Sequence, residues 1–262
     1  ITSSVDADGN VTTSVNPADT LIINKDIPDS EEITKDLPCK VITYSLEQDA
    51  DYCAANIVFD EFAHASFDCI RKGENIGRFT LSVPGMHNVS NALSAIALAE
   101  KVGIDLETVQ KGLLHFGGTD RRFQYKGKVG GVTVIDDYAH HPTEIEATLK
   151  TAANYPHKTT WCVFQPHTYT RTKALMQEFA QALSLADKVI LADIYAARET
   201  DNLGISSADL RDLLIEKGVD TYYFPTFDEI EAFLLENCIH GDVLITMGAG
   251  DVYKIGENLL GM

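Results

Sequence analysis

The strongest constraint on the fold is a regular alternation of strand-like and helix-like segments from Gly131 onward. The β-prone runs are "GVTVID", "TTWCVF", "KVILAD", "TYYF" and "DVLITM". The pattern predicts helices over Pro142–Ala153, Arg171–Leu185, Ser206–Lys217, Phe227–Asn237 and Val252–Leu260. Pro142 stands at the first position of its helix, which is the position that proline favours. This alternation indicates an α/β fold with a doubly wound, mostly parallel sheet.

The first half of the chain has a less regular pattern. Short buried strands are expected over Leu21–Asn24 and Lys40–Tyr44, and antiparallel strands over "ANIVFDEF" and over "ASFDCIRKGENIGRFTLSV", a hairpin turning at Lys72–Gly73. Helical spacing is found for Val89, Ala92, Leu93, Ile96 and Ala99, with Gly103 as the stop, and a second helix is expected over Leu106–Leu114. Glycine and charge separate the two halves at "GGTDRRFQYKG", so we predict domains over residues 1–122 and 123–262.

Composition and charge exclude several classes of protein. Apolar residues make up 45% and charged residues 23%, an average globular composition. The net charge of −18 argues against non-specific binding to nucleic acid or to an anionic membrane. No apolar run approaches the roughly 20 residues of a membrane helix. The five cysteines form no CxxC pair and the first residues do not resemble a signal peptide, so we expect a cytoplasmic protein without a zinc site or a disulfide framework.

Ionisable and aromatic residues gather where the predicted parallel strands end. They are Asp136, Asp137, Tyr138, His140, His141, His167, Tyr169, Arg171, Asp193, Tyr195, Arg198, Glu199 and Asp251. Ligands bind outside the carboxyl ends of strands in open parallel sheets, so these residues are candidates for a site. Alternatives remain for each segment: "DDYAHHP" as a solvated turn with a helix cap, "QPHTYTRT" as loop hydrogen bonds, and "GAGD" as a tight turn.

A second group of candidates starts the helix of the first half. Asn88 and Asn91 are three residues apart, on one face of its first turn. Two amides there can read the edge of a base or cap backbone groups. His87 is either a ligand or a histidine satisfied at the start of the helix.

The motifs of covalent catalysis and of common metal sites are absent from the sequence. There is no HExxH, the adjacent His140 and His141 cannot share a helical face, and there is no GxSxG elbow. The polar groups at the strand ends therefore indicate binding and electrostatic stabilisation rather than a protein nucleophile.

Six segments together resemble the Mur ligase family. They are "GMHNVSNALSAIALA", "GGTDRRFQYKG", "DDYAHHPTEI", "FQPHTYTRT", "DIYAARE" and "GAGD", in the family's order and covering nearly the whole chain from about Leu21 to Met262. The resemblance implies the latter part of a central ATPase domain followed by a complete C-terminal domain. It implies ATP-dependent ligation of L-alanine to UDP-N-acetylmuramate through an acyl phosphate, with Mg²⁺ held mostly by residues outside this chain.

The resemblance also implies roles for individual residues. His87, Asn88 and Asn91 would lie at the adenine, and Arg122 and Asp137 at the ATP phosphates and ribose as the catalytic pair. The L-alanine pocket would be formed by Tyr138, His140, His167 and Arg171, with the Arg171 guanidinium pairing with the substrate carboxylate.

The chain departs from the family pattern at several points. It has no GxxxxGK[ST] phosphate loop, so we expect a fragment that is inactive alone. Gly9 stands where a histidine ligand is expected, and Thr168 where some relatives carry a second basic residue. Two other functions remain open. They are a muropeptide-recycling ligase and a non-catalytic module that binds an amino acid or a nucleotide.

Overall fold

The computed structural model describes residues 2–5, 11–14 and 19–262. The chain forms two compact units, one of Ile1–Asp60 and His64–Gly117 and the other of Glu61–Ala63 and Gly118–Met262. Gly9, where the chain departs from the family pattern, lies outside the described residues.

The described part of the first unit is built around a five-stranded sheet of order β3-β4-β5-β6-β7. Its strands are β3 (Thr20–Asn24), β4 (Lys40–Ser45), β5 (Tyr52–Phe59), β6 (His64–Arg71) and β7 (Glu74–Pro84). β3, β4 and β5 pair in parallel, whereas β5–β6 and β6–β7 are antiparallel. The unit also contains β1 (Thr2–Val5), β2 (Val11–Ser14), α1 (Ser30–Thr34), α2 (Met86–Lys101) and α3 (Leu106–His115).

Local sequence explains the main features of this unit. The β6–β7 hairpin turns at Lys72 and Gly73. Both residues have positive φ (50° and 85°), as in the type I′ turns that two-residue hairpins favour. The five predicted apolar positions of α2 are all buried against the sheet. Gly103, at φ 82°, donates its N–H to the Glu100 carbonyl (3.1 Å) and ends the helix as expected.

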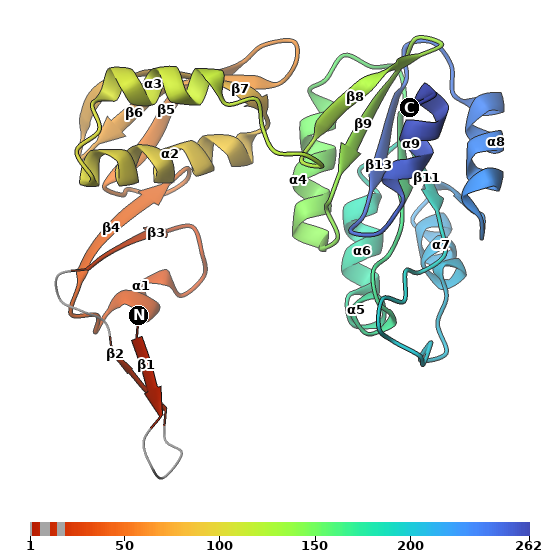
Figure 1. Cartoon of the computed structure of the whole chain (residues 1–262), viewed down its shortest axis with the longest axis horizontal. Coiled ribbons are helices and arrows are strands. Elements are labelled where there is room, and N and C mark those ends of the chain that lie inside the picture. The colour runs from red at the N-terminus through yellow and green to blue at the C-terminus, as the bar shows by residue number, and fades with distance from the viewer. Residues whose placement is uncertain (1, 6–10, 15–18) are drawn as a thin grey trace. The chain divides into compact units, whose positions relative to one another are not determined.

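Residues 118–262, all described, form a six-stranded sheet of order β12-β11-β10-β13-β9-β8. Its strands are β8 (Gln124–Val129), β9 (Val132–Asp137), β10 (Thr160–Phe164), β11 (Lys188–Leu191), β12 (Asp220–Tyr223) and β13 (Val243–Met247). Its helices are α4 (Pro142–Ala153), α5 (Tyr169–Ala174), α6 (Met176–Leu183), α7 (Ser207–Glu216), α8 (Phe227–Asn237) and α9 (Tyr253–Leu260), as Figure 1 shows. All neighbours pair in parallel except β8, which confirms the doubly wound α/β prediction.

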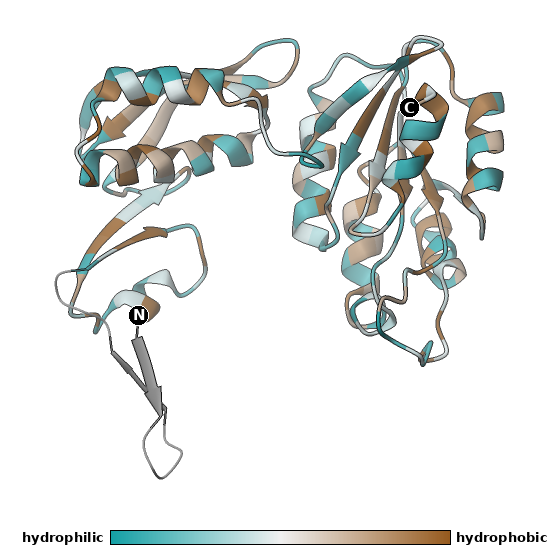
Figure 2. Ribbon diagram, in the orientation of Figure 1, coloured by the Kyte–Doolittle hydropathy of each residue, from teal (hydrophilic) through white to brown (hydrophobic). Residues whose placement is uncertain are grey.

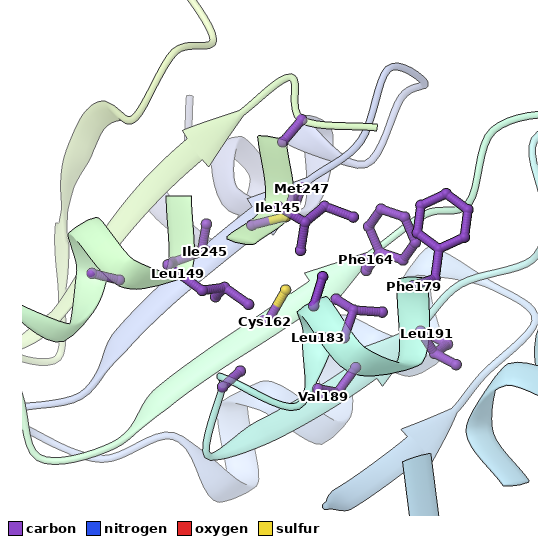
Figure 3. Packing of buried hydrophobic residues seen from close by; sticks show 14 of the residues in the cluster. Ile145, Leu149, Cys162, Phe164, Phe179, Leu183, Val189, Leu191, Ile245 and Met247 are labelled. Carbon is purple, nitrogen blue, oxygen red and sulfur yellow. The ribbon is translucent and has the colours of Figure 1, made fainter. Parts of the chain in front are cut away.

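The sheet of the second unit has an apolar layer on each face. One layer packs α4, α6 and α7 against strand residues such as Cys162, Phe164 and Ile245 (Figure 3). The other packs α8 and α9 against Trp161 and Val163 of the same strands. The helices carry brown and teal residues in alternation in Figure 2, as expected for elements that bury only one side.

Several local predictions were wrong. The helix expected over Arg171–Leu185 is two helices, broken at Leu175 (φ −115°). Glu199, from another loop, accepts hydrogen bonds at the start of α5, whereas α6 packs Phe179 against the sheet. One straight helix cannot make both contacts. The antiparallel edge strand β8 and the short helix α1 were not predicted. The residues of β3 are half-buried rather than buried.

Candidate functional site at the strand ends

The carboxyl ends of β9, β13 and β10 form the switch point of the second unit's sheet. β13 leads to α9, which packs on one face of the sheet. Its neighbours β9 and β10 lead to α4 and, through α5, to α6, and both α4 and α6 pack on the other face. Connections that leave adjacent strands in opposite directions open a crevice there. The polar residues predicted from the sequence follow these strands.

Backbone hydrogen bonds continue the sheet beyond its strands and fix the loops of this crevice. Gly248 N–H donates to the Asp137 carbonyl (3.0 Å), and Gln165 N–H to the Met247 carbonyl (3.0 Å). His167 and Tyr195 form an isolated parallel bridge. Segments far apart in the sequence are therefore held side by side.

Four aromatic side chains from three loops form a continuous row. The Tyr138 and His140 rings meet edge to face at 5.4 Å, His140 and His167 at 6.2 Å, and His167 stacks on Tyr195 at 5.4 Å and 24°. The structure thus brings together three of the four residues predicted for an amino-acid pocket. Tyr195, 40% exposed, completes the row and was not among the predicted ligands.

Arg171, the fourth predicted pocket residue, is held at the start of α5. Thr168 caps this helix by accepting from the Arg171 N–H (3.4 Å), with its own backbone at φ 67°. From the next loop, the Glu199 carboxylate accepts hydrogen bonds from the Tyr169 and Thr170 N–H groups. The hydrogen bond from the Thr170 hydroxyl, together with these two N–H groups, lowers the pKa of Glu199.

His167 and Arg171 each have a buried polar atom that lacks a hydrogen-bond partner within the described chain. These atoms are His167 Nδ1 and Arg171 Nη1. Burial, and then the positive charge of Arg171, lower the pKa of His167, which favours its neutral form at pH 7. A guanidinium beside a neutral imidazole suits a small carboxylate. Unsatisfied buried polar atoms of this kind favour a ligand that satisfies them.

His140 is oriented by Glu144 and by the backbone. The Nδ1 atom of its ring lies 3.0 Å from the Tyr138 carbonyl oxygen and 3.4 Å from Glu144 Oε2. The backbone N–H of His140 donates to the same carboxylate (3.0 Å). Burial alone raises the pKa of Glu144, but the His140 N–H and the nearby cationic side chains outweigh burial and lower it. His141 caps α4 instead, accepting from the Thr143 N–H at 3.4 Å.

The two catalytic candidates, Arg122 and Asp137, differ strongly in exposure. The Arg122 side chain is 52% exposed and pairs loosely with Glu144 (3.6 Å). Asp137 is 5% exposed, and its carboxylate accepts from the Phe123 N–H (2.9 Å), the Ala139 N–H (2.7 Å) and the Thr148 hydroxyl (3.0 Å). Burial raises the pKa of Asp137 although these donors oppose the effect. Arg122 is therefore accessible to a phosphate, whereas Asp137 here fixes the strand end and the backbone beside Arg122.

Arg121 is a site-building residue that the sequence prediction did not single out. Its Nε donates to Asp136 (2.8 Å) and its Nη2 to the Gly248 carbonyl (2.7 Å). Its guanidinium also lies over the Tyr138 and Tyr253 rings, at 4.9 and 4.6 Å from their centroids. The paired arginines of "DRRF" were the available signal, but the sequence does not distinguish which one points inward.

In the first unit, the predicted adenine residues start α2 beside an apolar cavity. Asn88 donates to the Pro84 carbonyl (2.8 Å) and accepts from Asn91 (3.1 Å), so both amides lie on one face as predicted. They line a cavity of about 280 Å³ whose other walls are Leu81, Val83, Ala92, Ala95, Leu113 and Phe116. His87 is exposed and is not among the lining residues. A flat aromatic ring with polar edges suits this cavity.

Two kinds of feature are absent from the part of the chain that the structure describes. No group of three His, Cys, Asp or Glu side chains there is arranged to hold a metal ion. No described helix is both long and apolar enough to cross a membrane.

Comparison with known families accounts for most of the chain. Residues 5–99 match the Mur ligase middle domain, and residues 121–250 match the Mur ligase glutamate ligase domain. This chain belongs to the Mur ligase family.

Two curated relatives of this Mur ligase chain carry the same name. It is 60% identical over 239 residues to the UDP-N-acetylmuramate–L-alanine ligase of Agathobacter rectalis, an alignment covering 91% of this chain and 52% of the relative. It is 55% identical over 246 residues to the ligase of the same name from Lachnospira eligens, covering 93% and 54%. The chain thus spans about half the length of the curated relatives it matches.

Solved structures resemble the Mur ligase chain in fold. The UDP-N-acetylmuramate–alanine ligase of Thermotoga maritima superposes with a TM-score of 0.71 at 29% identity, covering 84% of this chain and 47% of that one. The murein peptide ligase of Psychrobacter arcticus gives a TM-score of 0.66 at 24% identity, covering 94% and 52%. At that identity the second likeness bears on the fold alone.

Proposed function

We propose that this chain is part of an ATP-dependent amide ligase that joins L-alanine to UDP-N-acetylmuramate in peptidoglycan precursor synthesis. The observation that carries the proposal is the strand-end site, where Arg171 and His167 present unsatisfied buried nitrogens beside a row of aromatic rings. The names of the relatives at 55–60% identity support the same activity. The reaction belongs in the cytoplasm, where its nucleotide substrates are made.

In this proposal the strand-end site binds L-alanine. The guanidinium of Arg171 and the neutral ring of His167 bind the carboxylate, and His140 and Tyr138 close the side of the pocket. Contact of these rings with the small methyl group is proposed to favour alanine over larger amino acids.

In the first unit, the start of α2 is proposed to bind the adenine of ATP. Asn88 and Asn91 present amides to the adenine edge above the apolar cavity, whose walls suit the flat ring. The exposed guanidinium of Arg122 is proposed to bind a phosphate, and the buried Asp137 to hold the backbone beside it. His87 is proposed to border this site from its exposed place on α2.

Mg²⁺ is proposed to assist the transfer of the phosphoryl group, as a charge-neutralising ion. The described residues contain no cluster that fits it, so we assign it no ligand here.

A substitution with a matched control tests the alanine site. In the full-length ligase, Arg171→Gln should raise the KM for L-alanine roughly a hundredfold, because a charge-assisted hydrogen bond is lost. Arg198→Gln changes an exposed arginine on the neighbouring loop and should leave that KM within about twofold. Equal effects of the two substitutions contradict the assignment of Arg171.

A muropeptide-recycling ligase is the second candidate. The likeness to the murein peptide ligase bears on the fold alone and does not favour this activity. Turnover with a peptide acceptor in place of L-alanine would favour it.

A further inference from the structure

Gln165 is the residue of the strand-end site for which neither the motifs nor the proposed function provides a role. It follows β10 directly and is 6% exposed. Five buried side-chain polar atoms of the described chain lack a hydrogen-bond partner, and three belong to the short segment of Gln165, His167 and Arg171. Since buried polar atoms in proteins are normally satisfied, this concentration indicates a site shaped for a polar ligand.

The amide of Gln165 is oriented by its surroundings. Its Nε2 faces the Asp193 carbonyl at 3.5 Å, so the carbonyl oxygen Oε1 points the other way. A flipped amide would place two acceptors against each other. Oε1 is therefore a buried acceptor without a partner in the described chain.

Gly250 shows where this oxygen points. A Cβ added at Gly250 would lie 2.3 Å from Gln165 Oε1 and 3.2 Å from Cδ2 of Tyr195. Tyr195 in turn stacks on His167 at 5.4 Å. Oε1 thus points to Gly250, beside the Tyr195 end of the aromatic row, and a side chain at position 250 would block it.

The three unsatisfied atoms are chemically complementary to an α-amino acid. Arg171 Nη1 is a donor that suits a carboxylate, and His167 Nδ1 adds a second polar contact. Oε1 of Gln165 is only an acceptor, so it needs an N–H or O–H donor. The amino group of an amino acid is such a donor, and it is the nucleophile of an amide ligation.

We infer that Gln165 is a substrate-positioning residue whose Oε1 accepts a hydrogen bond from the amino group of the amino-acid substrate. The inference rests on the proposed function. The N–H that donates to Gln165 leaves the nitrogen lone pair of the free amine directed away from Gln165, available to attack the activated carboxyl group. Orientation of this kind raises the rate because the reacting atoms are already aligned.

The test compares two substitutions in the full-length ligase. Gln165→Met keeps the length of the side chain but removes the acceptor, and should raise the KM for L-alanine about tenfold to a hundredfold while the KM for ATP stays within about twofold. Gln165→Glu retains an acceptor oxygen for the amino group but places its other oxygen against the Asp193 carbonyl, so it should recover only part of the loss. Thermal unfolding of both variants verifies that they fold.

A competitor that lacks the amino group separates this contact from a merely structural role. Propionate has the carboxylate of alanine, and its inhibition constant against L-alanine should be the same in the wild type and in Gln165→Met. An unchanged KM for L-alanine, or equal weakening of alanine and propionate, overturns the inference and leaves the proposed function intact. Absence of alanine-dependent turnover in the wild type overturns the proposed function itself, and this inference with it.

Discussion

Arg121 and Asp136 form a buried ion pair at the end of β9, with Nε and Oδ2 2.8 Å apart and the Asp136 side chain 2% exposed. The Thr246 hydroxyl also donates to Asp136 (2.8 Å), so strands β9 and β13 share this carboxylate. The guanidinium then reaches the Gly248 carbonyl in the following loop (2.7 Å). One arginine therefore ties the two strand ends that border the candidate site.

Replacing Arg121 should destabilise the second unit. Arg121→Met leaves the Asp136 charge buried without its partner and should lower the free energy of unfolding by about 3 kcal/mol. Arg122→Met is the matched control, because its pair with Glu144 is exposed and long (3.6 Å) and contributes about 0–1 kcal/mol. Urea unfolding of both variants measures the difference, and equal losses contradict the structural role of Arg121.

The lowered pKa of His167 predicts a dependence of stability on pH. Between the lowered pKa of folded His167 and the ordinary value of 6.5, the unfolded chain takes up a proton that the folded chain resists. The contribution of His167 to stability therefore falls as the pH drops below 6.5, and above that value it no longer changes with pH. His167→Gln should remove this contribution. Urea unfolding between pH 5 and 8 measures it, and identical slopes for wild type and variant would disprove it.

The charge of Arg171 predicts a shift in the titration of His167. After burial, this guanidinium is the largest cause of the lowered pKa, so Arg171→Leu should raise the pKa of His167 toward its ordinary value. NMR titration of the imidazole resonances gives the value directly. A pKa that does not move would mean that the two side chains are not neighbours in solution.

Two glycine substitutions should have effects of opposite sign. A Cβ at Gly248 would lie 2.8 Å from the Gln165 carbonyl oxygen, on a backbone at φ 147°, so Gly248→Ala should cost at least about 2 kcal/mol of stability. Gly112 lies within α3 with nothing near an added Cβ, so Gly112→Ala should gain about 0.5–1 kcal/mol. Thermal denaturation tests both signs.

Asn91 should affect nucleotide binding but not folding. It is exposed at the cavity in the first unit, and Asn91→Ala should raise the KM for ATP about tenfold through the loss of a hydrogen bond to the base. Ser94→Ala, about one turn along α2 and outside the cavity lining, is the control. Equal values of KM for the two variants would remove Asn91 from the adenine site.

Strong local signals allowed several elements to be predicted from the sequence. The bounds of α4 and α8 match the prediction residue for residue. Pro142 marks the start of α4, and the structure shows a capping box of Thr226 with Glu229 at the start of α8. β8 was missed because it is an edge strand of sequence QYKGKV, in which no residue is fully buried. The alternation of apolar and polar residues that marks a half-buried strand is therefore weak there.

The site was predicted in part, for a similar reason. Position at a strand end identified Tyr138, His140 and His167, since topology alone brings such residues together. The inward turn of Arg121 depends on its backbone at φ 60° and on partners more than 100 residues away, including the Gly248 carbonyl. The break between α5 and α6 likewise depends on Glu199, 30 residues beyond Tyr169. Such long-range contacts are not encoded in any short motif.

The central claim is tested most directly by following ADP formation from ATP by the full-length ligase with UDP-N-acetylmuramate and Mg²⁺, once with L-alanine and once with the tripeptide that a recycling ligase accepts. The account predicts turnover with L-alanine and none above background with the tripeptide. Turnover with the tripeptide alone, or with neither acceptor, would contradict it.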